Sequence, residues 1–373
     1  MPNVKDKSDV IIIGGGVVGV AAAYFLASDG INVTLFDKDS VAAHASGFAA
    51  GVLLPKVGND ETRSEPITNL SLNLHREFSE SIPSESGISY GYCEKPALII
   101  GTTENKNFER DRFYGNENPQ KNDSLVEWLD KDQVRRVEPR LSHEICGGLL
   151  VKNVIELDPY ALCLSFWKSA QLNGAKLKTD MVDEIIVDGS RAVGVKVAGE
   201  PYFSDVIIVA SGPWAGGLLN KCGINIPVVP MKGQIVRLLV DEPDLDTSVW
   251  CEGNYATSKP DGNVWCGTTE EFVGFDEKPT ENARLEIMRS MIEILPFLAR
   301  SKVVKQTACL RPIVKDGIPV LGKSMSIDNV IIATGAGRHG ITIGPGMGLI
   351  TSQLVQGIKT DIDISEMDPK RFD

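Results

Sequence analysis

Residues 9–19 read DVIIIGGGVVG, and this stretch decides the fold of the chain. Its apolar first half is typical of a buried parallel strand, and the alanine-rich segment 17–27 is typical of a helix. Gly14 permits a tight turn, Gly16 lets the backbone approach a pyrophosphate, and Gly19 lets the helix pack closely on the strand. The segment therefore predicts the strand–turn–helix of a dinucleotide-binding site, with phosphates at the helix N-terminus.

The next segment indicates which dinucleotide is bound. A second strand is predicted over residues 31–36, and it ends at Asp37, where a carboxylate can hold ribose hydroxyls. No arginine adjoins Asp37, which argues against the 2′-phosphate of NADP. The small residues of 44–51 (HASGFAAG) would let backbone amides approach a flat ring system, which favours FAD over NAD. A plain flexible loop is the alternative reading of this run.

Two later segments repeat the pattern of an apolar strand that ends in glycine, at residues 206–212 and 330–340. Ligands of doubly wound sheets collect at such strand ends. Residues 226–279 instead show antiparallel strands, with a turn at 260–263. The chain is therefore expected to be α/β (α+β overall), with a discontinuous Rossmann-like domain and an inserted domain built on a mainly antiparallel sheet.

Three further predictions concern two helices and a loop in the rest of the chain. Thr280 is expected to cap a helix that runs to Leu295 and packs through Leu285, Met288, Ile292 and Leu295. A helix is expected to open at residues 344–348 and to run to about Leu354. The polar tract 102–123 is expected to be surface loop or irregular helix.

Composition excludes several classes of protein. The 373 residues carry a formal net charge of −12, which repels nucleic acid phosphate. Seven cysteines without CxxC spacing support neither a disulfide framework nor a metal site, and they suit a reducing cytoplasm. Residues 10–28 carry no charge, but their change of rhythm indicates strand, turn and helix instead of a membrane span.

Taken in order along the chain, the motifs resemble the FAD-dependent D-amino-acid oxidase superfamily, closest to its glycine oxidase and D-amino-acid dehydrogenase branch. The resemblance covers nearly the whole chain. The motifs that carry it are GxGxxG with Asp37, Ala45-Ser46 to Ala49-Ala50-Gly51, Glu138-Pro139-Arg140-Leu141, Asp158-Pro159, Lys232-Gly233-Gln234, Gly267-Thr268-Thr269-Glu270-Glu271, Gly274-Phe275-Asp276, Leu310-Arg311-Pro312, Asp316-Gly317 with Pro319 and Gly322, and Thr334-Gly335 with Arg338 and Gly340.

The resemblance implies an FAD-binding domain over 1–85, 141–225 and 305–373, and a substrate domain over 86–140 and 226–304. It implies hydride transfer from the α-carbon of a small amino acid or secondary amine, such as glycine, sarcosine or a D-amino acid, to flavin N5. The imino acid formed would hydrolyse to a keto acid and ammonia. Electrons would then pass to oxygen or to a quinone or protein acceptor.

Three residues are expected to act on the substrate: Arg311 and Tyr255 at its carboxylate, and Arg338 beside it. The guanidinium fork suits two carboxylate oxygens, whereas the alternative for Arg311 is a surface salt bridge. The residues expected to bind FAD are Gly14, Gly16, Val17, Val18, Gly19, Asp37, Lys38, Ala45, Ser46, Ala49, Ala50, Gly51, Val182, Ser211, Gly212, Trp214, Arg311, Gly337, Arg338, His339, Gly340, Ile341 and Thr342.

Several alternatives stay open at this point. FAD is expected to be bound non-covalently, but Cys309 lines up with the cysteine that carries covalent flavin in the monomeric sarcosine oxidase branch. The substrate could instead be a 2-hydroxy acid or a cyclic amine. The chain could also be a flavin-binding subunit without turnover of its own, and it could form a homo-oligomer.

Overall fold

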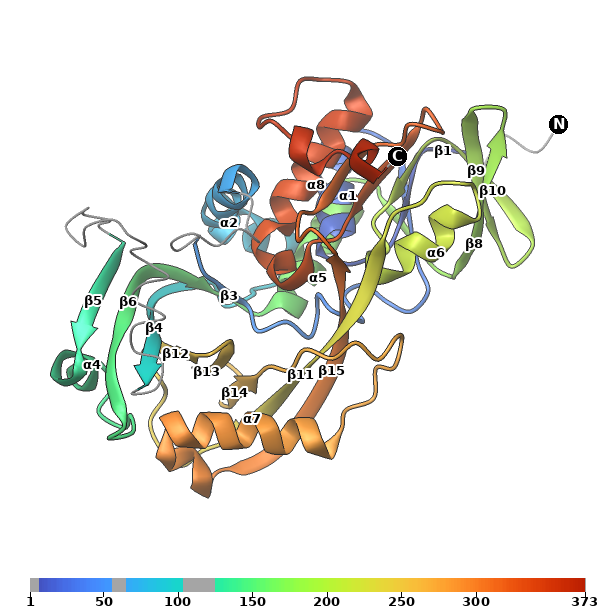
Figure 1. Ribbon diagram of the computed structural model, residues 1–373. Coiled ribbons are helices and arrows are strands. Elements are labelled where there is room, and N and C mark those ends of the chain that lie inside the picture. Colours follow the sequence, from blue (N-terminus) through green and yellow to red (C-terminus); the bar gives the residue numbers. More distant parts are fainter. Residues whose placement is uncertain (1–6, 56–64, 103–124, 373) are drawn as a thin grey trace.

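The computed structural model describes residues 7–55, 65–102 and 125–372. The predicted loop 102–123 lies outside them apart from its first residue. The chain forms two sheets with helices around them (Figure 1). None of the described helices is both long and apolar enough to cross a bilayer.

The first sheet has eight strands and carries the nucleotide-binding motif. β1, from the predicted first segment, pairs in parallel with β2 and β10, and β10 pairs in parallel with β17. β16 adds an antiparallel edge, and β8 and β9 extend β10 as an antiparallel ribbon. The order is β16 (Val320–Lys323), β17 (Val330–Thr334), β10 (Glu200–Val209), β1 (Ser8–Ile13), β2 (Val33–Asp37) and β7 (Lys176–Thr179), with β8 (Val182–Asp188) and β9 (Arg191–Val197) beside it.

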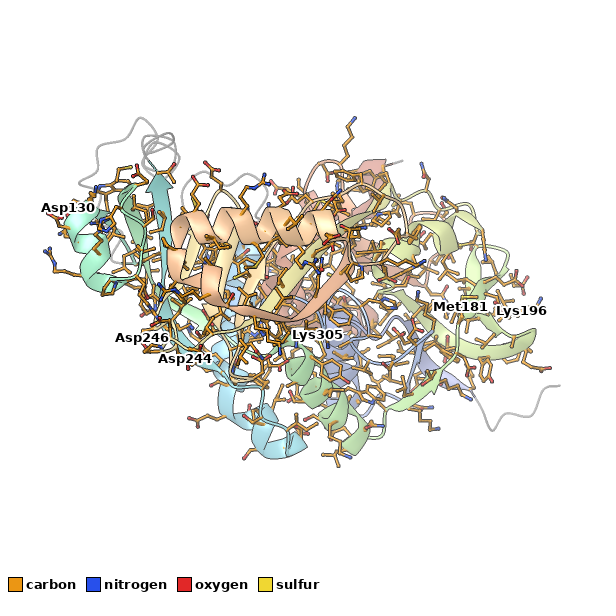
Figure 2. All side chains as sticks on the ribbon, turned by 90° about the horizontal axis from the view of Figure 1, so that it is seen from below. Asp130, Met181, Lys196, Asp244, Asp246 and Lys305 are labelled. Atoms are coloured by element: carbon orange, nitrogen blue, oxygen red, sulfur yellow. The ribbon has the colours of Figure 1, made fainter. Side chains whose placement is uncertain are left out.

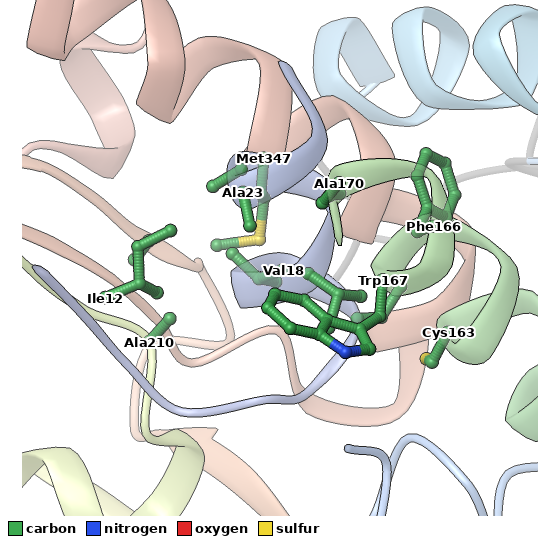
Figure 3. Packing of buried hydrophobic residues seen from close by; sticks show 14 of the residues in the cluster. Ile12, Val18, Ala23, Cys163, Phe166, Trp167, Ala170, Ala210 and Met347 are labelled. Carbon is green, nitrogen blue, oxygen red and sulfur yellow. The ribbon is translucent and has the colours of Figure 1, made fainter. Parts of the chain in front are cut away.

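Alternate residues of β1 enter two different cores, because both faces of a parallel sheet are covered. Val10 and Ile12 pack against the helices, whereas Ile11 and Ile13 pack toward β8, β9 and α6 (Ala215–Asn220). Met347 lies beside Ala23 in the helical core (Figure 3). The helices of that core are α1 (Val17–Ser28), α2 (Glu65–Ser86), α5 (Pro159–Leu172) and α8 (Gly340–Gln356).

The second sheet has nine strands and is antiparallel except where β4 meets β12. Helix α7 (Glu281–Ile294) lies across β11, β13 and β14, and Figure 2 shows it from below. The order is β15 (Lys302–Val314), β11 (Val228–Leu239), β14 (Val264–Gly267), β13 (Asn254–Ser258), β12 (Ser248–Cys251), β4 (Cys93–Thr102), β6 (Ile145–Glu156) and β3 (Val52–Leu53), while β5 (Val126–Asp130), followed by α4 (Lys131–Val137), pairs with β6. The predicted fold class is confirmed.

The domain boundaries stay a prediction, and sheet membership differs from them at three strands. β3 and β6 lie in the second sheet, although their residues were assigned to the FAD-binding domain. β15 also lies there along its whole length, beyond the predicted boundary at residue 305. Chain order could not reveal this, because β6 joins the sheet by pairing with β4, about fifty residues earlier. We therefore propose that the division follows the sheets.

Two helix predictions need correction. Thr280 does cap α7, through Ala283 N, but the buried face is formed by Ala283, Ile287, Met291 and Ile294. Of the four predicted core residues, Leu295 is fully buried and Met288 and Ile292 pack partly buried against the same core, whereas Leu285 is 54% exposed. The register of the apolar stripe was ambiguous because apolar residues occur on both neighbouring faces of the helix.

The second correction concerns α8, which begins at Gly340 instead of at 344–348. Glycine and proline in 344–348 are poor helix formers, which is why the sequence placed the start there. In the structure these residues lie inside the helix, and Pro345 is its sixth residue. The glycines allow close packing, since a Cβ at Gly344 would lie 2.6 Å from the Val17 side chain.

Candidate functional site: a cavity between the two sheets

A cavity of about 1420 Å³ lies between the strand ends of the first sheet and one face of the second. It is larger than the roughly 300–1,000 Å³ typical of pockets for drug-sized ligands. Its lining contains the ends of β1, β10 and β17, as well as residues of β11, β13 and β15. The cavity therefore has a nucleotide-binding side and a side formed by an antiparallel sheet.

The glycine turn after β1 forms a close-packed cradle on the first side. Gly14 has φ +112°, and a Cβ there would lie 2.7 Å from the Ala210 carbonyl carbon and 2.8 Å from Ser211 Cα. A Cβ at Gly19 would collide with the Gly14 carbonyl oxygen. Gly19 does not line the cavity, so its close helix packing, which the spacing predicted, is its visible contribution.

Polar groups surround this cradle. Asp37 accepts hydrogen bonds from Gly15 N (2.7 Å) and Asp39 N (2.9 Å), and it lines the cavity. Each carboxylate oxygen retains a second lone pair. Ser46 Oγ accepts from Val17 N at 3.0 Å, which ties the small-residue loop to the start of α1.

An aromatic cluster closes the cavity near Asp37. Lys38 Nζ lies 3.9 Å from the centroid of the Trp214 ring, and the His44 and Phe275 rings lie 4.7 and 5.8 Å from it. His44 also contacts Asp39 and Glu277 through its two ring nitrogens. The segment that carries Phe275 and Glu277 thus crosses from the second sheet to the first domain.

The sheet side of the cavity is built around Arg311 and Tyr255. Arg311 lies on β15 and its side chain reaches over Gly233 of β11, where a Cβ would collide with the guanidinium. Tyr255 pairs with Gly267, where a Cβ would lie 2.8 Å from the tyrosine oxygen. Two glycines in neighbouring strands therefore leave room for the two polar side chains to lie on one face of the sheet.

Arg311 is held by groups that carry no charge. Its Nη1 donates to Thr269 O at 3.1 Å and its Nη2 donates to Thr268 Oγ1 at 2.5 Å. Across residues 7–55, 65–102 and 125–372, no carboxylate forms an ion pair with it. The surface salt bridge that was the alternative for Arg311 is therefore not formed with any described residue. The guanidinium faces the cavity with N–H groups that are free to donate, and it can therefore bind an anion.

Tyr255 carries a buried hydroxyl to which the described residues offer no hydrogen-bond partner. The residue is 3% exposed and lines the cavity. Burial raises the pKa of Tyr255 far above its usual range, and the nearby Arg311 lowers it only in part. The hydroxyl is therefore a protonated donor, and a ligand in the cavity could supply the missing acceptor.

Arg338 lies in the short segment between β17 and α8. It lines the cavity and forms an ion pair with Glu270 at 2.6 Å, at a position that is 42% exposed for the arginine side chain. It is therefore at the rim, not on the sheet face that carries Arg311 and Tyr255. Its predicted role beside the substrate stays a prediction.

The structure brings nearly all of the predicted site residues to this one cavity. Gly19 is the exception. The predicted site residues that line the cavity are Gly14, Gly16, Val17, Val18, Asp37, Lys38, Ala45, Ser46, Ala49, Ala50, Gly51, Val182, Ser211, Gly212, Trp214, Tyr255, Arg311, Gly337, Arg338, His339, Gly340, Ile341 and Thr342.

Several residues that line the cavity have roles that were not predicted from the sequence. Thr268 positions Arg311, Gly233 makes room for it, and Glu270 pairs with Arg338. Trp250 and Ile235 form apolar wall on the same face as Tyr255. The alternation of Gly233 and Ile235 along β11 was the available signal, because residues two apart face the same side.

These features fit a dinucleotide with a flat ring system, and they define the class of a dinucleotide-dependent enzyme. The glycine cradle admits a backbone-bound pyrophosphate, the cavity is large, and Ser211 Oγ is buried without a partner among the described residues. Residues 9–354 match the family described as FAD dependent oxidoreductase (DAO), and the chain belongs to this family. It is an FAD-dependent oxidoreductase, which confirms the resemblance.

Similar proteins match nearly the whole chain. A glycine oxidase of Geobacillus kaustophilus is 28% identical over 96% of both chains, and the crystal structure of glycine oxidase from this organism superposes with a TM-score of 0.90 over 98% of this chain and 99% of that one. Iminodiacetate oxidase from Chelativorans sp. BNC1 is 26% identical, with a TM-score of 0.87 over 96% and 98% of the two chains.

Proposed function

We propose that the protein oxidises a small amino acid or secondary amine at its α-carbon, with glycine, sarcosine and D-amino acids as the first candidates. The observation that carries this proposal is that Arg311 and Tyr255 lie on the same cavity face. Among the described residues, Arg311 has no carboxylate partner and the Tyr255 hydroxyl has no hydrogen-bond partner. Relatives named glycine oxidase and iminodiacetate oxidase support the same substrate class.

Each residue has a distinct role in this proposal. Arg311 binds the substrate carboxylate with two parallel N–H groups, while Thr268 and Thr269 hold the guanidinium in place. Tyr255 donates its hydroxyl to the same carboxylate. Bound FAD supplies the hydride acceptor. No general base is needed if the amine enters neutral, because the hydride then leaves directly from the α-carbon.

An anaerobic substrate panel tests this function. The purified holoenzyme is mixed under anaerobic conditions with glycine, sarcosine, D-alanine, D-proline, glycolate and lactate, and the flavin absorbance is followed. We expect bleaching by at least one amino acid and none by the hydroxy acids. Bleaching by hydroxy acids alone would assign the protein to the hydroxy-acid alternative, and no bleaching by any compound would favour a subunit without turnover.

The acceptor, the compartment and the assembly are part of the same proposal. We propose that oxygen is the acceptor, with a quinone or protein acceptor as the other possibility, that the enzyme works in the cytoplasm, and that it forms a homo-oligomer. The names of the oxidase relatives support oxygen. Hydrogen peroxide formed in step with oxygen consumption would support oxygen as the acceptor; reoxidation only by an added quinone would contradict it.

Replacing Gly233 with alanine is expected to damage catalysis without unfolding the protein. The new Cβ would occupy the place of the Arg311 guanidinium, which is the flexible end of a side chain and can move aside. A displacement of about 1 Å can cost about 100-fold in rate, so we expect kcat/KM to fall about 10- to 100-fold with FAD still bound. Gly217→Ala, also in the cavity lining but with open space, is the control.

Replacing Tyr255 with phenylalanine tests the orphan hydroxyl. A hydrogen bond to a charged group is worth about 1.5–3 kcal/mol, so kcat/KM is expected to fall about 10- to 150-fold. Because burial raises the pKa of Tyr255, the hydroxyl stays protonated below pH 10, and the loss should be equal at pH 7 and pH 9. A loss that disappears at pH 9 would mean that the hydroxyl ionises in this range.

Acid precipitation tests the attachment of FAD. Cys309 lines the cavity and is 6% exposed, and burial raises the pKa of its thiol, although Arg311 opposes this. The thiolate is the reactive form, so the environment disfavours attack on the flavin. We expect a yellow supernatant and a colourless pellet; a yellow pellet that becomes colourless in Cys309→Ala would establish the covalent link.

A further inference from the structure

The hydrogen-bond ladder of helix α8 has a break, which is one carbonyl without a donor from the helix's own backbone. Pro345 has no N–H and therefore cannot donate to the carbonyl of Ile341, four residues earlier. The proline ring also crowds that carbonyl, although the residues around it stay helical. Ile341 and Gly346 are both buried, so an unsatisfied carbonyl or amide at either residue would lower stability.

Two side chains of α2 repair this break. His75 Nε2 lies 2.9 Å from the Ile341 oxygen, and Ser71 Oγ accepts from Gly346 N at 3.0 Å. A carbonyl oxygen only accepts, so Nε2 carries the proton. Ser71 and His75 are four residues apart and therefore lie on one face of α2. One face of α2 thus replaces the missing donor and supplies an acceptor for the Gly346 amide.

The repaired turn belongs to the cavity. Gly340, Ile341 and Thr342 form the first turn of α8 and line the space in which FAD binds. The side chain of the N-cap residue His339 forms no capping hydrogen bond at this end of the helix, and no acidic residue lies in the first turn. The N–H groups and the positive end of the helix dipole at this turn are thus presented to the cavity.

His75 is suited to a neutral, fixed role. It is 2% exposed, and burial lowers its pKa to about 4, so the ring is uncharged at neutral pH. Close glycine contacts already hold α8 against α1, since a Cβ at Gly348 would lie 2.8 Å from Ala22 N. Gly344 and Gly348 make such contacts from the second turn of α8 onward, whereas His75 is bonded to Ile341 in the first turn. The position of the first turn therefore depends on α2.

We propose that His75, together with Ser71, is a positioning residue for the FAD site, which holds the first turn of α8 so that its N–H groups face the bound flavin. This proposal rests on FAD binding and is independent of which substrate is oxidised. The alternative is a histidine that contributes to the core and nothing more. The two differ in whether flavin binding and potential respond separately from stability.

The test compares three variants with the wild type. His75→Leu removes the donor, and His75→Gln returns an N–H at about the same reach. Thr351→Val is the matched control, because it removes a buried hydrogen bond of α8, from Thr351 to Met347 O, at a distance from the first turn. For each, the affinity of the apoprotein for FAD is measured by quenching of flavin fluorescence, together with the flavin midpoint potential and the melting temperature of the apoprotein.

We expect His75→Leu to bind FAD about 10-fold more weakly, as for one lost hydrogen bond, and to have a lower midpoint potential. His75→Gln should restore both, and Thr351→Val should change neither even if it melts at a lower temperature. Wild-type affinity and potential in His75→Leu would overturn the proposal. If His75→Leu does not fold, Ser71→Ala decides in the same way. A wild type without affinity for FAD would instead contradict the cofactor assignment.

Discussion

Replacing Arg311 with alanine is expected to remove most of the activity while leaving FAD in place. Removal of one partner of a buried charge pair costs about 2–5 kcal/mol, so kcat/KM for the best amino acid should fall about 30- to 5,000-fold. The loss should be large because, among the described residues, Arg311 is the only lysine or arginine in the strands of the second sheet that lines the cavity. Anaerobic flavin reduction, followed by stopped flow, measures the effect without the acceptor step.

Two further variants make this result specific. Arg311→Lys keeps the charge but loses the two-pronged geometry, and we expect an intermediate loss. Arg284→Ala removes an arginine on α7 that pairs with Glu281 at the surface, and it should behave as the wild type. Undiminished flavin reduction in Arg311→Ala would contradict the assignment of the carboxylate site, whatever the substrate.

Replacing Gly14 with alanine is expected to give a protein that retains little FAD. The backbone at this residue has φ +112°, which L side chains rarely adopt, and the new Cβ would overlap the carbonyl of Ala210. Backbone strain of about 1–3 kcal/mol and overpacking of about 1–3 kcal/mol together are expected to lower the free energy of unfolding by about 2–6 kcal/mol. The ratio of flavin to protein absorbance after purification, with the melting temperature, measures both effects.

Gly30→Ala separates the two causes. Gly30 also has a positive φ, +79°, but a Cβ there would meet no atom within 4 Å. It therefore reports the cost of strain alone, and it should keep its full content of FAD. If Gly14→Ala and Gly30→Ala lost FAD equally, the close approach of β1 and β10 at the glycine turn would not be what shapes the site.

The predicted elements that were correct depend on short-range chemistry. The strand before Gly14 and the helix after Gly16 follow from an apolar run, a glycine turn and an alanine-rich segment, all within twenty residues. The helix at 281–294 follows in the same way from its cap at Thr280. Its buried face was predicted only in part, since Leu285 is exposed. Which side of a helix is covered depends on the partner that packs against it.

The start of α8 shows the same limit. Local propensity places a helix start at the glycines and proline of 344–348, yet the helix begins at Gly340. The Ile341 carbonyl, which Pro345 leaves without its helical donor, is satisfied by His75, and Gly346 N donates to Ser71, two residues that lie some 270 positions earlier in the chain. No local pattern contains this information.

The sequence by itself determined the nucleotide-binding unit, the family and about a third of the residues that line the cavity, because these depend on motifs with fixed spacing. Only the tertiary structure decided that Arg311 has no carboxylate partner among the described residues, that the Tyr255 hydroxyl lacks a hydrogen-bond partner there, and that Gly233 makes room for the guanidinium. Those properties arise from strands that are distant in the chain and meet through backbone pairing, so they exist only once the sheet has formed.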